Sequence, residues 1–417
     1  MNRLEQRYRR SERKFLSFGK GTKTKNGIKD ENEKPRAAKQ SENSRVEKDV
    51  TECRQTLIVA ARRVQANAVL HRALDREVPR EVKLPTLFPE AGVRVRRLLL
   101  VLLLLVFTLF AIAAARYQPP FGHWSRASAK PIFSPNGNSW QSAGVFNPAV
   151  VKSNGEFVML YRAQDTKGTS RLGYASSNDG LHFTSLPEPV LSPEASYEKD
   201  GGVEDPRLVA IDGTYYLTYT GYNTKDAQLC LATSKDLQHW DRKGVILPAY
   251  KGNWNKGWTK SGAILTQKVD GKYWMFFLGT AADKTDQMGL AYSADLLHWT
   301  EATPTPVLPK RPGMFDSRVV EPGPPPVMTK DGILLIYNGA DDKLLYQVGW
   351  ALFDKNDPRK VLARSDAPIL GPEKDWEKVG QVPNVTFVEG LVREGDRWLL
   401  YYGGADKYVG VAEAHSR

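Results

Sequence analysis

The chain has 417 residues, 41% of them hydrophobic and ten of them tryptophan, so it can bury a sizeable core in one large domain or two to three average ones. The formal net charge of +12 is uneven: residues 1–97 hold 25 Lys and Arg against 13 Asp and Glu, whereas residues 117–417 hold 33 against 34. A near-neutral folded part argues against a nucleic-acid-binding protein, and two cysteines, Cys53 and Cys230, cannot form a disulfide framework.

The first 97 residues are predicted to be a basic, largely disordered tail. Residues 1–50 are polar and charged and contain few aromatic residues, which is typical of segments that cannot bury enough apolar surface to fold.

Residues 98–115 form an uncharged apolar run. At ~1.5 Å per residue, a helix of this length spans ~27 Å, enough for a bilayer core. Because Arg94, Arg96 and Arg97 precede it, the positive-inside rule predicts a single-pass membrane protein with a cytoplasmic N-terminus and the large domain outside. The small residues 111–115 also fit a signal-peptidase site, so a cleaved signal and a secreted or periplasmic product is the alternative.

Beyond a predicted linker over residues 116–130, the chain repeats itself. Asp179, Asp236 and Asp295 each follow a strand rich in small residues, at spacings of 57 and 59 residues, and further steps of 59 reach Asp354 and Glu413. Short β-forming runs separated by Gly, Asp and Asn turns lie between these markers. Repeats of about 40–60 residues with four strands each are typical of propellers. The sequence therefore predicts an all-β fold, a five-bladed β-propeller over residues 131–417, with structural marker turns.

In a propeller, a site is expected in the central funnel, built from one or two polar residues per repeat. The densest polar cluster, residues 201–207, contains Glu204 and Asp205. A carboxyl group held protonated near neutral pH can serve as the acid in glycosidic cleavage, although a turn with an Asp–Arg ion pair fits the same residues. Metal-ligand spacing, a phosphate-binding glycine loop and a nucleophile elbow are not recognisable in the sequence, so no metal or cofactor is expected.

From Gly202-Val203-Glu204-Asp205-Pro206-Arg207 onward, the sequence resembles the mannoside phosphorylases and β-1,2-mannosidases of glycoside hydrolase family 130. The likeness covers roughly residues 140–415 and continues through Asn147-Pro148-Ala149, Gly323-Pro324-Pro325-Pro326, Val382-Pro383-Asn384 and Tyr402-Gly403-Gly404-Ala405-Asp406. The resemblance implies a five-bladed propeller and an inverting reaction in which Asp205 is the general acid and its proton reaches the glycosidic oxygen through a sugar hydroxyl. Independently of the resemblance, polar residues that recur at equivalent inner positions of the repeats are the candidate substrate-binding residues: Asn147, Arg162, Arg171, Glu204, Asn338, Asn384 and Asp406.

The residues that hold phosphate in the phosphorylases are only partly present. Lys260, Arg318 and Tyr346 match three of those contacts, but Asn338 replaces the usual histidine, and a second arginine expected near Leu278 is missing. Fewer cationic donors weaken the case for a phosphate nucleophile.

A new carboxylate, Glu321, stands before Gly323, where it could activate water. We therefore predict hydrolysis of a β-mannoside oligosaccharide or glycan, with Asp205 as acid and Glu321 or Glu389 as base. The alternatives are a phosphorylase using inorganic phosphate, a mannosyltransferase acting on a cell-surface glycan, and a non-catalytic carbohydrate-binding propeller.

Overall fold

The computed structural model describes residues 117–137 and 139–417. The predicted tail (1–97) and membrane or signal segment (98–115) lie outside the described residues. Within the described part, no helix has the length and apolar character needed to cross a membrane. That part is all-β, as predicted, and its helical pieces are the 3-10 helix η1 (Ser139–Gln141) and α4 (Asp375–Lys378).

Consecutive strands pair antiparallel in groups, which we name after the inner strand of each. The β2 group contains β2 (Gly144–Ser153), β3 (Glu156–Gln164), β4 (Ser170–Ser177) and β5 (Thr184–Ser185). The β6 group contains β6 (Gly202–Ile211), β7 (Thr214–Tyr222), β8 (Ala227–Ser234) and β9 (Asp241–Leu247). The β10 group contains β10 (Thr259–Val269), β11 (Lys272–Thr280), β12 (Asp286–Ser293) and β13 (Thr300–Glu301).

The β14 group contains β14 (Val319–Pro322), β15 (Val327–Met328), β16 (Ile333–Ala340), β17 (Tyr346–Phe353) and β18 (Val361–Arg364). The β19 group contains β19 (Thr386–Glu394), β20 (Arg397–Gly404) and β21 (Tyr408–His415), and β1 (Ser125–Arg126) pairs with the outer edge of β21. Residues from the segment predicted as a linker thus complete a sheet built by the C-terminus.

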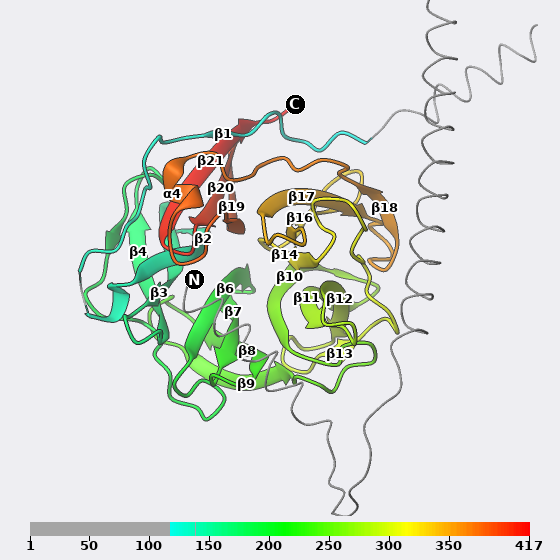
Figure 1. The fold of residues 1–417 in the computed structure, drawn as a ribbon. Coiled ribbons are helices and arrows are strands. Elements are labelled where there is room, and N and C mark those ends of the chain that lie inside the picture. The colour runs from blue at the N-terminus through cyan, green and yellow to red at the C-terminus, as the bar shows by residue number, and fades with distance from the viewer. Residues whose placement is uncertain (1–116, 138) are drawn as a thin grey trace, which may run out of the picture. The chain divides into compact units, whose positions relative to one another are not determined.

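The inner strands lie around a common centre (Figure 1). β2 contacts both β19 and β6, β6 contacts β10, and β10 contacts β14, while β16 contacts β19. This ring is propeller-like, and any residue on the inner strands has neighbours from several groups.

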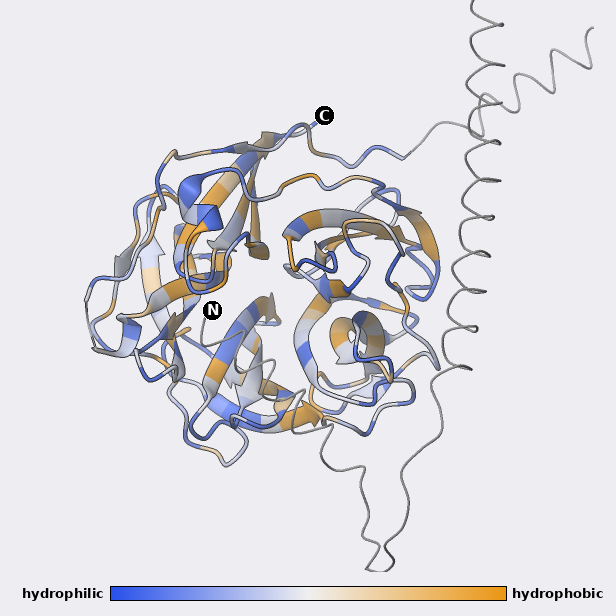
Figure 2. Cartoon of the chain, in the orientation of Figure 1, coloured by the Kyte–Doolittle hydropathy of each residue, from blue (hydrophilic) through white to orange (hydrophobic). Residues whose placement is uncertain are grey.

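Hydrophobic residues are concentrated in the strands and hydrophilic ones in the connections (Figure 2). Each sheet packs against a neighbouring sheet on either side, so both of its faces are covered. The core cluster that contains Phe157 and Tyr161 of β3, for example, also contains Leu399 and Tyr401 of β20. Two-sided burial explains why the middle strands read as continuous apolar runs instead of alternating patterns.

The repeated marker turns have the structural role that the sequence predicted. Asp236 accepts hydrogen bonds from the main-chain N–H groups of Gln238 and His239, and its Oδ2 lies 2.7 Å from His239 Nδ1. Asp179 and Asp295 make the same contacts in their turns. The last predicted marker differs, because Glu413 lies within β21, opposite Leu399.

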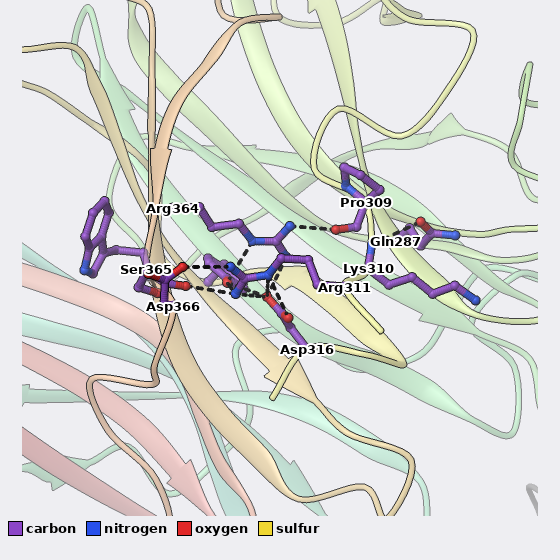
Figure 3. Close-up of polar contacts among 10 residues, drawn as sticks. Gln287, Pro309, Lys310, Arg311, Asp316, Arg364, Ser365 and Asp366 are labelled. Atoms are coloured by element: carbon purple, nitrogen blue, oxygen red, sulfur yellow. Dashed lines mark hydrogen bonds and ion pairs between the residues drawn. The ribbon is translucent and has the colours of Figure 1, made fainter. Parts of the chain in front are cut away.

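A triad of a carboxylate, a tyrosine and an arginine (Asp316, Tyr337 and Arg364), joined by a second arginine (Arg311), stabilises the connection that leads into the β14 group. Arg311 and Arg364 converge on the buried Asp316, with Nη2 atoms 2.8 and 2.6 Å from its Oδ2 (Figure 3). Tyr337 donates its hydroxyl to the same oxygen over 2.7 Å. Because Asp316 is completely buried, these partners are what stabilises its charge.

Equivalent triads occur in the β6 and β19 groups. Glu198 accepts from Tyr219 and Arg242, and Glu377 accepts from Tyr402 and Arg126. The three outer-strand arginines also share one register position, since each pairs with an alanine of its neighbouring strand (Arg242 with Ala232, Arg364 with Ala351, Arg126 with Ala412).

The β10 group departs from this pattern. Glu301 occupies the arginine position, opposite Ala291. Phe277 stands where the other groups have tyrosine, and the buried Nδ2 of Asn255 has no hydrogen-bond partner in the part of the chain that the structure describes. The β10 group therefore lacks the buried ion pair that the β6, β14 and β19 groups have.

Candidate functional site

The candidate site begins with irregularities in the inner strands. Asn147, Asp205 and Ser261 have positive φ values of 51°, 51° and 60°, and each stands at a register shift in β2, β6 or β10. A similar shift in β19 falls at Glu389. Because a β-bulge redirects a side chain, four inner strands present a polar residue at comparable positions.

Asp205 connects the β6 group, to which it belongs, with the β2 group. Its Oδ1 accepts a hydrogen bond from Asn147 Nδ2 at 2.8 Å and one from Arg162 Nη1 at 2.9 Å, and the residue is 5% exposed. Burial raises the pKa of Asp205, but the positive charges of Arg162 and Lys260 outweigh it and hold the pKa at about 2. Asp205 is thus a carboxylate in the free protein.

Arg162 joins Asp205 to further acidic groups. Its Nη2 lies 2.5 Å from Glu204 Oε1, which also accepts from Ser170 Oγ at 3.0 Å. Burial raises the pKa of Glu204, and the charge of Arg162 opposes that rise. Burial, together with the charge of Asp205, raises the pKa of Asp406 to about 7 against the opposing charge of Arg162. Several carboxyl groups near one arginine give the site groups that can exchange protons near neutral pH.

Glu389 lies deeper, against Arg207. Its Oε1 is 2.7 Å from Arg207 Nη1, and both side chains are at most 1% exposed. The contact is an ion pair without hydrogen-bond alignment, because neither Glu389 oxygen has a hydrogen-bond partner among the described residues. Burial raises the pKa of Glu389 well above its usual value. Arg207 also donates to the carbonyl oxygens of Pro322 and Gly323, which links β6 to the β14 group.

Five residues form what we call the Lys260 subsite: Lys260, Asp286, Arg318, Glu321 and Tyr346. Lys260 Nζ lies 3.5 Å from Glu321 Oε1, to which Ser261 also donates a hydrogen bond. Burial lowers the pKa of Lys260, but the charges of Glu321 and Asp205 outweigh it and raise the pKa. Burial and the charge of Glu321 raise the pKa of Tyr346. The three residues predicted to bind phosphate therefore share their subsite with two carboxylates.

Three predicted substrate-binding residues have other surroundings. Arg171 pairs with Asp165 at 3.0 Å instead of joining Asp205. Asn338 is completely buried, and its amide both donates to the carbonyl of Val388 and accepts from its N–H. Asn384 is exposed, with its main-chain carbonyl bonded to the Tyr346 N–H. Asn338 therefore joins β16 to β19 through both atoms of its amide.

Asp286 belongs to the site although motif reasoning missed it. It stands three residues before Gly289, at the position that Ser170 holds before Gly173 and Tyr346 holds before Gly349. Its Oδ1 accepts a hydrogen bond from Thr280 Oγ1 at 2.6 Å. Aligning the repeats at these glycines was the signal that would have found it.

Comparison with known proteins places this geometry in context. The model of glycoside hydrolase family 130, described as beta-1,4-mannooligosaccharide phosphorylase, matches residues 116–417. A 1,2-beta-oligomannan phosphorylase of Thermoanaerobacter sp. (strain X514) is 43% identical over 298 residues, which cover 69% of this chain and 95% of the relative.

Two solved structures are also similar. One comes from work stating that the GH130 family of mannoside phosphorylases contains glycoside hydrolases that target beta-1,2 mannosidic linkages in Candida mannan. It is 36% identical, with a TM-score of 0.65, and the match covers 72% of this chain and 96% of that one. The other, a beta-1,2-mannobiose phosphorylase from Listeria innocua in complex with beta-1,2-mannobiose, is 27% identical, with a TM-score of 0.64 and coverage of 70% and 97%.

Proposed function

Because the chain belongs to glycoside hydrolase family 130 and is a mannoside-active enzyme, we propose that it hydrolyses β-1,2-mannosides. The reaction inverts the configuration at the anomeric carbon, and Asp205 is the general acid. The β-1,2 linkage is proposed because the relative with 43% identity and both solved structures are described with it. The observation that carries hydrolysis is the 3.5 Å contact of Glu321 with Lys260.

Asp205 is proposed as the acid because it is an inner-strand carboxyl group of the β6 group that accepts hydrogen bonds from Asn147 and Arg162 of the β2 group and retains some exposure. With a pKa of about 2 it carries no proton in the free protein. A sugar bound at the centre of the ring of strands displaces water from around Asp205. This loss of hydration favours the protonated form of the Asp205 carboxyl group. In this proposal, proton uptake is therefore coupled to binding of the mannoside.

Glu321 is preferred to Glu389 as the base. Glu321 is 1% exposed, but its buried Oε2 has no hydrogen-bond partner within residues 117–137 and 139–417, so a water molecule held beside Lys260 is a suitable partner for it. Glu389 is completely buried and its Oε1 already pairs with Arg207 Nη1 at 2.7 Å, which makes it less suited to take a proton from water.

Phosphorolysis is the second candidate. Lys260, Arg318 and Tyr346 stand together in one subsite, and the 43% identical relative is named a phosphorylase. The position of Glu321 beside Lys260 argues against phosphorolysis, because a carboxylate repels a bound phosphate dianion. A mannosyltransferase would use the same acidic centre with an acceptor sugar in place of water.

Product analysis separates these functions. Incubation with β-1,2-mannobiose should release mannose without any requirement for inorganic phosphate. Mannose 1-phosphate as the main product would replace hydrolysis by phosphorolysis, and longer oligosaccharides would indicate transfer. If turnover is absent on all mannosides tested while sugar still binds, the protein is a carbohydrate-binding propeller.

We also propose that the five strand groups are the five blades of a propeller, because each contributes one inner strand to the ring around the centre. The apolar run of residues 98–115 and the basic residues before it support a membrane anchor with this domain outside the cytoplasm. Protease treatment of intact cells tests this: residues 117–417 should be cleaved from outside, and their protection would contradict the proposal.

A further inference from the structure

Asp286 occupies a particular place in the sheet shared by the β10 and β14 groups. It pairs with Thr280 on one side and, in the single parallel pair between β12 and β14, with Val319 on the other. Lys260 pairs with Leu278, two residues before Thr280 on β11, and Arg318 directly precedes Val319. Asp286 therefore lies close enough to both cations of the Lys260 subsite for their charges to act on it.

A small apolar cluster lies on the strands that carry these residues. Leu278, Val319 and Ala340 form a buried cluster, and Tyr346 packs against it. Glu321 is almost completely buried at 1% exposure, whereas Asp286 is half-buried. Asp286 is consequently the more exposed of the two carboxylates in this subsite.

The charges around Asp286 influence which nucleophile the Lys260 subsite can bind. Its carboxylate interacts electrostatically with Lys260, Arg318 and Glu321. The two cations and two carboxylates leave the subsite close to neutral when all four are ionised. A phosphate dianion needs cations whose charge is not already balanced, whereas a water molecule does not.

We infer that Asp286 is a specificity-determining residue that lowers the affinity of the Lys260 subsite for a phosphate dianion. The hydrogen bond from Thr280 fixes the carboxylate in the place where a phosphate oxygen would approach Lys260 and Arg318. This inference rests on the proposed function, because it explains why a subsite with phosphate-type residues is used by water.

The test replaces the charge and keeps the shape. In Asp286→Asn, inorganic phosphate should bind about tenfold more tightly or better, because one like charge has been removed next to a dianion. The measured quantity is the inhibition constant of phosphate against mannobiose hydrolysis, or its KM where mannose 1-phosphate forms. The matched control is Asp283→Asn on the same hairpin, whose carboxylate pairs with Lys310 at 2.6 Å outside the subsite and whose loss should leave the constant unchanged.

If Asp286→Asn does not fold, Asp286→Ser is the replacement, since Ser170 holds the same register position in the β2 group. A phosphate constant equal to that of wild type in a folded Asp286 variant overturns the inference. The proposed function fails separately, if the wild-type enzyme makes mannose 1-phosphate as its main product. In that case the change in KM for phosphate still decides whether Asp286 acts as inferred.

Discussion

Asn147 donates its side-chain amide to Oδ1 of Asp205 over 2.8 Å, and this bond joins the inner strands of the β2 and β6 groups. Both residues stand at bulges with φ near 51°. Arg162 reaches the same oxygen at 2.9 Å. Two donors on one carboxylate oxygen stabilise its charged form, so the environment that positions Asp205 also opposes its protonation until a sugar binds.

Replacing Asp205 by asparagine should abolish proton delivery while preserving the bond to Asn147 through the new amide. General acid catalysis contributes about 10²–10⁴-fold to rate, so turnover of β-1,2-mannobiose should fall by about that factor. Asp241→Asn is the control, because that carboxylate is 71% exposed on β9. A folded Asp205→Asn enzyme within about tenfold of wild type would remove Asp205 from the mechanism.

Replacing Asn147 by alanine removes one of the two donors to Asp205. Because the lost hydrogen bond stabilised the charged carboxylate, the pKa of Asp205 should rise from about 2. Carbon-13 NMR titration of the Asp205 carboxyl group measures this directly. An unchanged pKa would mean that the charges of Arg162 and Lys260 alone set it.

The sequence could predict the class of fold because its repeat is visible in single residues. Asp179, Asp236 and Asp295 form alike turns after equivalent strands, and the alignment of these turns predicted where the strands lie. Glu413 failed as a marker because its strand continues past the turn position to pair with β1, and this closure by the other end of the described chain has no signal in the repeat itself.

Individual side chains of the site were harder to predict, because residue type does not reveal which face of a strand points inward. Arg171 follows Ser170, which contacts Glu204, yet Arg171 itself turns to Asp165. Alternation along β4 explains the difference. Asn338 is predicted to bind substrate, and the sequence alone does not show that both of its amide atoms bond to the main chain of Val388.

Asp406 should make stability depend on pH. Folding raises its pKa from 3.8 to about 7, so the folded state binds this proton more tightly than the unfolded chain. The contribution to stability is complete below about pH 4 and is lost as the pH rises through about 7. Relative to Asp406→Asn, the wild-type protein should therefore lose at least about 1 kcal/mol of unfolding free energy between pH 5 and pH 8. Urea unfolding at both pH values measures the difference, and a constant offset between the two proteins would contradict the assignment.

The triad of Glu198, Tyr219 and Arg242 should contribute strongly to stability. Arg242 Nε lies 3.1 Å from the completely buried Glu198, so Arg242→Met leaves a buried charge without its counter-ion and should cost about 3–5 kcal/mol. Glu301→Gln is the matched control, because Glu301 holds the same register position and its Oε1 has no hydrogen-bond partner among the described residues. This change should cost about 1 kcal/mol or less. Both are measured by urea unfolding. Equal losses in the two variants would show that the outer strands, and not the ionic triads, set the stability of this fold.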